Sequence, residues 1–77
     1  MPADLQFRGW QRSASESLIH AVCDTDAAHV LAYVANAKEA ADNAIETATN
    51  PRQVVMAEAL KRAAEQVEML AAHPDQM

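Results

Sequence analysis

The sequence predicts an all-α protein: an antiparallel helical hairpin preceded by a short helix and an extended N-terminal arm. Three observations favour this fold class. Glycine occurs once, at Gly9, and Pro51 is the only proline between Pro2 and Pro74, so few residues suit turns. Eighteen of the 77 residues are alanine, which forms helix well. Apolar residues also recur at three- and four-residue steps over two long segments, which is the spacing of one helix face.

Residues 1–12 are predicted to form the arm, and residues 13–77 the helical hairpin domain. Leu5 and Phe7 alternate with polar residues, which is typical of extended chain, and the single glycine provides a bend. Two of the three aromatic residues, Phe7 and Trp10, lie in this arm. The arm therefore either covers the open end of the helices or anchors a partner protein. Core cover suits Phe7, and partial exposure suits Trp10.

Ser13 and Glu16 fit a capping box at the start of a short helix that runs to about Cys23. The Asp-Thr-Asp sequence at 24–26 contains good N-cap residues that are poor inside helices. We therefore expect a break there, with a new helix starting near the threonine. One continuous helix over 13–49 is the alternative.

The long middle helix is predicted over about 26–48, with a heptad-like apolar seam. Most residues of this seam are alanine, so a facing helix can approach closely. The seam consists of Ala27, Val30, Val34, Ala37, Ala41, Ala44 and Ala48.

The clearest local signal is the start of the last helix. Asn50 is a good N-cap, Pro51 suits the first helical position, and Gln53 completes the capping pattern. The link between the two long helices is therefore about two residues long. A link this short predicts that the two helices are antiparallel neighbours. The last helix is expected to end at His73-Pro74. Its apolar stripe consists of Met56, Ala57, Leu60, Ala63, Ala64, Val67, Leu70 and Ala71.

Self-association is predicted because the chain is short of large apolar side chains. Chains of this length seldom gain more than ~3–5 kcal/mol from one core and usually need further support. The single cysteine, Cys23, excludes an internal disulfide. We therefore expect a homodimer that forms a helical bundle. The residues predicted to mediate self-association are Val30, Val34, Ala37, Ala41, Leu60 and Val67.

The formal net charge of −5 argues against binding to nucleic acid or to an anionic membrane surface. No secretion signal is visible, and the longest apolar run, Val30–Ala35, is far too short to span a bilayer. A lone thiol fits a reducing compartment. We therefore expect a cytoplasmic protein.

Metal-ligand residue types gather only around His20 and Cys23, which lie one turn apart and are followed by Asp24, Asp26 and His29. Their spacing matches no common zinc site, and no third group is apparent that would orient a cysteine–histidine pair for catalysis. The sequence therefore predicts no enzyme, no cofactor and no metal site. A metal-dependent unit centred on His20 and Cys23 is kept as an alternative.

The predicted function is that of a small non-enzymatic protein-interaction module that binds and inhibits or regulates a larger protein. Its size and acidity match the general character of phage or mobile-element antagonists, such as anti-CRISPR or anti-activator proteins, although no motif carries that likeness. A small helical chaperone or assembly subunit, of the kind that serves secretion systems, is the alternative. The predicted partner-binding residues are Phe7, Arg8, Trp10 and Arg12.

Overall fold

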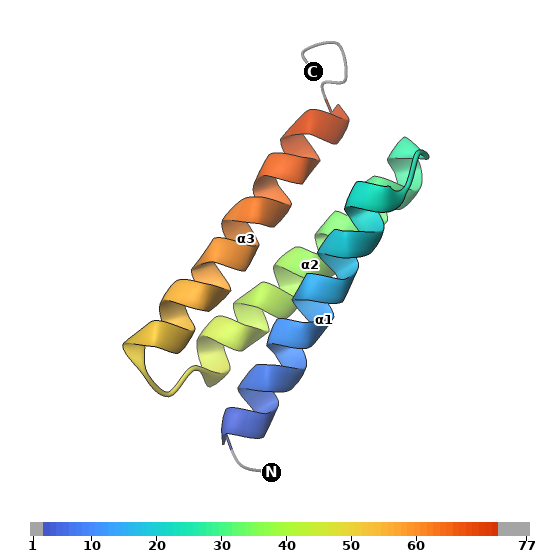
Figure 1. Ribbon diagram of the computed structural model, residues 1–77. Coiled ribbons are helices and arrows are strands. Elements are labelled where there is room, and N and C mark those ends of the chain that lie inside the picture. The colour runs from blue at the N-terminus through green and yellow to red at the C-terminus, as the bar shows by residue number, and fades with distance from the viewer. Residues whose placement is uncertain (1–2, 73–77) are drawn as a thin grey trace.

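The computed structural model describes residues 3–72 and confirms the all-α class, with three helices and no strand in that range. Successive helices run in opposite directions, and α2 packs against both of its neighbours, whereas α1 and α3 contact each other much less (Figure 1). The predicted end of the last helix at His73-Pro74 lies outside the described residues. The helices are α1 (Ala3–Cys23), α2 (Ala27–Thr47) and α3 (Pro51–Ala72).

The extended arm predicted over 1–12 is wrong where the structure describes it, because α1 begins at Ala3 and continues through Gly9. Ser13 therefore lies inside a helix, and the predicted capping box at that residue is wrong too. The physical reason is a buried stripe with seven-residue spacing, formed by Phe7, Ala14 and Ala21. Packing this stripe stabilises helix across a glycine that would otherwise favour a bend.

The predicted break at 24–26 is confirmed, and the alternative of a continuous helix is wrong. Asp26 is the N-cap of α2, with an extended backbone at φ −92° and ψ 117°. Its carboxylate accepts hydrogen bonds from the amides of Ala28 at 2.9 Å and His29 at 3.4 Å. The amide of Asp26 in turn donates to the Asp24 carboxylate at 2.8 Å. These bonds satisfy backbone donors that a helix start leaves without partners.

The predicted start of the last helix is also confirmed. The Asn50 side-chain oxygen accepts from the Gln53 amide at 2.9 Å, and Pro51 is the first residue of α3. The Gln53 side-chain oxygen accepts from the Thr49 amide at 2.8 Å. The Asp4 carboxylate accepts from the Thr49 hydroxyl and from the Gln53 side-chain amide, both at 3.2 Å. This network joins the first turn of α1 to the link between α2 and α3.

The core consists mainly of alanine. Val34 is the largest side chain that is fully buried, and Phe7 is the only buried aromatic residue among those described. Interior positions of this kind are sensitive to added volume, because protein cores are close-packed. Of the predicted seam, Ala27 is exposed and Ala48 is half-buried. The buried members are Val30, Val34, Ala37, Ala41 and Ala44.

Polar contacts between α1 and α2 lie to one side of the alanine core. The Asn36 side-chain amide donates to the hydroxyl of Ser17, which is buried, at 2.6 Å. One turn further along, the rings of His20 and Tyr33 stack with centroids 5.2 Å apart. Both contacts therefore lie along the same side of the interface between α1 and α2.

Two ion pairs connect α2 to α3. Lys38 lies 3.3 Å from the Glu68 carboxylate, and Lys61 lies 2.8 Å from the Asp42 carboxylate. The hydrogen bond that the Lys61 ammonium donates to the Asp42 carboxylate, together with the negative charge of that carboxylate, raises the pKa of Lys61. Both lysines are partly exposed, and exposed ion pairs add little to the free energy of unfolding. These pairs therefore serve mainly to align α3 with α2.

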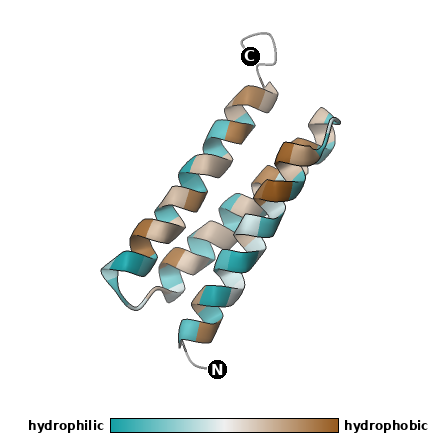
Figure 2. Cartoon of the chain, in the orientation of Figure 1, coloured by the Kyte–Doolittle hydropathy of each residue, from teal (hydrophilic) through white to brown (hydrophobic). Residues whose placement is uncertain are grey.

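Apolar residues are unevenly spread along the helices. In Figure 2, α1 is mostly hydrophilic over its first half and hydrophobic near its C-terminal end. Within residues 3–72, no helix combines the length and apolar character that crossing a bilayer requires.

We predict that Ala37→Leu destabilises the fold, because Ala37 is fully buried and a close-packed core does not accommodate three more carbon atoms without strain. Overpacking of this kind typically costs ~1–3 kcal/mol, and each kcal/mol lowers the melting temperature of a domain this size by roughly 4–8 °C. Ala35→Leu is the matched control, because Ala35 is exposed on the same helix. Thermal unfolding followed by circular dichroism measures both. Equal melting temperatures for the two variants would show that the α2 face has been assigned wrongly.

Candidate functional site

The four predicted partner-binding residues do not share one surface. Phe7 is only 3% exposed and packs with Ala44 and Ala57, which is the core-covering position expected of it. Trp10 is 40% exposed, as also expected. Arg8 and Trp10 lie two positions apart on α1, which separates them by about 200° around the helix axis. Phe7 and Arg8 therefore do not contribute to a site built around Trp10.

Trp10 instead borders a shallow surface depression on α1, which we call the α1 depression. Leu5 and Trp10 are its large apolar residues, exposed by 51% and 40% respectively. Gly9 lies between them, and a Cβ atom added there would meet no atom within 4 Å. The remaining residues that line the depression are Gln6 and Ser13.

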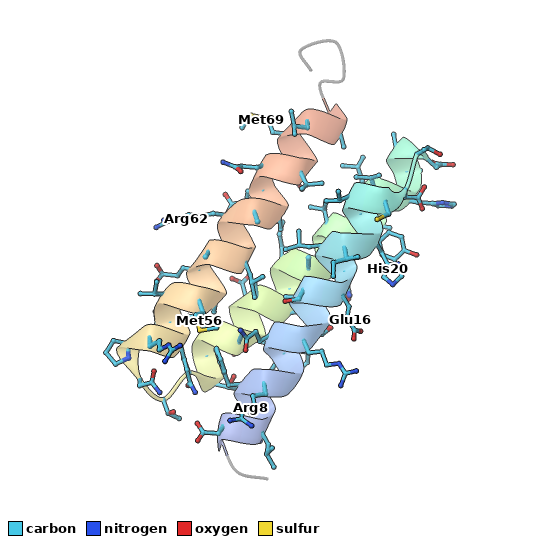
Figure 3. All side chains as sticks on the ribbon, in the orientation of Figure 1. Arg8, Glu16, His20, Met56, Arg62 and Met69 are labelled. Carbon is cyan, nitrogen blue, oxygen red and sulfur yellow. The ribbon has the colours of Figure 1, made fainter. Side chains whose placement is uncertain are left out.

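Arg12 places a positive charge beside the α1 depression. It follows Gly9 by three positions, so the two residues are neighbours on one helix face. The Arg12 Nε atom donates to the Glu16 carboxylate at 2.9 Å, and the Arg12 side chain is almost fully exposed. In Figure 3, Arg8 lies on the first turns of α1 and Glu16 lies further along the helix. An apolar depression with one flanking ion pair is suited to contact with another macromolecule.

His20 and Cys23 have no third candidate ligand beside them in the part of the chain that the structure describes. The His20 ring is stacked on Tyr33, and the Cys23 thiol is exposed. His29 lies 3.4 Å from Asp24 at the start of α2. Over residues 3–72, no three His, Cys, Asp or Glu side chains form a group that could hold a metal ion. The geometry therefore does not favour the metal-dependent alternative.

A second apolar site, which we call the end cleft, lies where the C-terminal ends of α1 and α3 meet the start of α2. Its volume is about 380 Å³, and Val22 and Leu70 on its rim are 69% and 46% exposed. The sequence does not predict this cleft, because its lining residues come from the ends of all three helices. The other lining residues are Ala21, Asp24, Thr25, Ala27, Val30, Val67 and Ala71.

The residues predicted to mediate self-association are largely occupied by packing within one chain. Among them, Leu60 and Val67 are half-buried, and the four from α2 are buried against α1 and α3. Met56, predicted on the packed stripe of α3, is instead 38% exposed. In Figure 3, Met56 lies on the flank of α3 towards α1, and Met69 lies on the opposite flank. Any surface for self-association must therefore be sought outside the predicted seam.

Comparison with protein-family models, with curated proteins and with solved structures finds no match for this chain.

We predict that Phe7→Ala strongly destabilises the fold, because this substitution removes the largest buried side chain of α1. Loss of a buried phenylalanine costs roughly 3–5 kcal/mol. Leu5→Ala is the control on the same helix, since Leu5 is half-exposed and its truncation should cost much less. Urea unfolding followed by helicity measures both. If the two variants unfold at the same urea concentration, Phe7 does not carry the packing assigned to it.

Proposed function

We propose that this chain is a small non-enzymatic protein-interaction module that binds a larger protein through the α1 depression and inhibits or regulates it. The depression combines two exposed apolar side chains, Leu5 and Trp10, with an adjacent charged residue, Arg12. Tryptophan and arginine are the residue types most enriched where binding energy concentrates in protein interfaces.

The observation that carries this proposal is the position of Gly9. Glycine inside a helix costs about 0.5–1 kcal/mol relative to alanine. Gly9 has no positive φ that would require a glycine, and nothing within the chain approaches the place of its missing Cβ. The folded chain by itself thus has no use for glycine here. A glycine here would be useful if the backbone of another molecule approached α1 closely, because only glycine has no side chain that would keep that backbone away.

A partner segment seated over Gly9 would lie between the Trp10 indole and the Leu5 side chain. Both side chains lose exposed apolar area in that arrangement, which favours binding by roughly 25 cal/mol for each Å² removed from water. The partner surface is therefore expected to present a small or extended segment rather than a bulky side chain at its centre.

An antagonist and a chaperone would both use the contacts described above. The identity of the bound protein distinguishes these two functions. An antagonist of the phage or mobile-element type captures a functional enzyme or regulator, whereas a chaperone or assembly subunit captures a component of the apparatus that it serves. We further propose that the chain acts as a homodimer, since its core is poor in large side chains.

We predict that Gly9→Leu abolishes partner capture while leaving the fold intact, because the new side chain projects from the exposed α1 depression and its Cβ atom would meet no atom of its own chain within 4 Å. Trp10→Ala should also lose the partner, and neither change should lower the melting temperature by more than a few degrees. An affinity pull-down from the native host, read by quantitative mass spectrometry, measures capture.

Met69→Ala is the matched control, because Met69 is an exposed apolar residue on a different helix. It should capture the same protein as the unmodified chain. Unchanged capture by both Gly9→Leu and Trp10→Ala would move the binding site away from α1.

A further inference from the structure

We propose that a second copy of this chain docks antiparallel along the exposed flank of α3, centred on Ala63, so that Met56 of each copy enters the end cleft of the other. We call Met56, Ala63 and Leu70 the α3 stripe. The inference rests on the self-association proposed above and names the surface that mediates it, which is separate from the α1 depression.

The first observation is the distribution of charge around α3. Between Arg52 and the end of the helix, every charged residue lies on one flank, at three- and four-residue steps. The flank that carries the α3 stripe has no charge over the same length. For a chain of net charge −5, a helix flank free of acids is the kind on which two copies approach without repulsion. The charged residues are Glu58, Lys61, Arg62, Glu65 and Glu68.

The second observation is the symmetry of the α3 stripe. Met56 and Leu70 each lie seven residues from Ala63, so a two-fold axis at Ala63 brings Met56 of one copy opposite Leu70 of the other. A two-fold interface requires this kind of self-complementary surface. Ala63 is small and only half-buried, so the two α3 helices can approach closely at the centre.

The third observation is the fit between Met56 and the end cleft. The cleft lies beside Leu70, about two heptads or roughly 21 Å along α3 from Met56. Antiparallel docking about Ala63 therefore delivers Met56 of the second copy to an apolar cleft of about 380 Å³. Methionine is flexible and polarisable, and it fills irregular apolar gaps well. Because the proposed arrangement is two-fold symmetric, Met56 of each copy fills the end cleft of the other.

Charges at the two ends of this surface are complementary. Arg52 is exposed near the start of α3, and Asp24 lines the end cleft near the other end of the molecule. Antiparallel docking brings Arg52 of one copy towards Asp24 of the other. A parallel arrangement would instead place the two Arg52 side chains together, so the charges favour the antiparallel register.

The available area approaches what a stable dimer needs. Standard interfaces bury about 800 Å² on each partner, which is about 15% of the 5211 Å² that this chain exposes. A flat strip about 33 Å long and about 20 Å wide, which covers α3 and the edge of α1, has an area of about 660 Å². Protruding side chains add further accessible surface to this flat area.

Cysteine cross-linking of the full chain tests this arrangement. In a Cys23→Ser background, Ala63→Cys should form a disulfide-linked dimer on mild oxidation, because the two substituted positions face each other. The double variant Met56→Cys, Leu70→Cys should do the same between chains. Within one chain these positions are roughly 21 Å apart, and a disulfide requires Cα atoms within about 7 Å. Met69→Cys is the matched control on the opposite flank and should remain uncrosslinked.

Light scattering at micromolar concentration should report about twice the 8.3 kDa chain mass. Leu70→Glu should raise the dimer dissociation constant at least about tenfold, because it buries a charge opposite Met56, whereas Met69→Glu should leave it unchanged. A monomeric unmodified chain would overturn both self-association and this surface. A dimer that cross-links through Met69→Cys and not through Ala63→Cys would overturn the surface alone. Loss of partner capture by Gly9→Leu bears only on the α1 depression.

Discussion

Close packing of alanine faces around α2 is the constraint on which the rest of this structure depends. A methyl group at each contact lets α1 and α3 lie near α2, but it buries little apolar area per residue. Among the described residues, Phe7, Val30 and Val34 are the only buried apolar side chains larger than alanine. The fold thus relies on shape complementarity more than on bulk, and it leaves several large apolar side chains at the surface. Those exposed residues make the α1 depression, the end cleft and the α3 stripe possible.

The central position of α2 also separates the surfaces available for binding. Because α1 and α3 contact each other only weakly, each of them presents a flank to solvent that the other does not cover. The α1 depression is lined by residues of α1 alone, and the α3 stripe consists of residues of α3, on the other side of α2 in the chain order. The surface proposed for a second copy and the surface proposed for a different protein therefore share no residue.

Interruptions between helices were predictable because local hydrogen bonds create them. Asp26 and Asn50 cap the residues that follow them, and such bonds follow from sequence spacing alone. The conformation of residues 3–12 was not predictable in the same way. Gly9 and the alternation before it favour an extended chain locally, whereas burial of Phe7 depends on residues far along the sequence. Trp10 and Arg12 were predicted as binding residues, but Leu5 and Gly9 were not, since Gly9 becomes unusual only once it is known to lie inside a helix.

The bond between Ser17 and Asn36 has a consequence for how this molecule avoids alternative structures. Smooth alanine surfaces offer little resistance to one helix sliding along another by a turn, since each methyl group finds a similar neighbour after the shift. A slide of that kind would break the hydrogen bond between Asn36 and the buried Ser17 hydroxyl, at a cost of about 0.5–1.5 kcal/mol. The hydroxyl–amide pair thus selects one alignment among several of similar packing energy, and a chain built mainly from its smallest helix-forming residue keeps a single native arrangement.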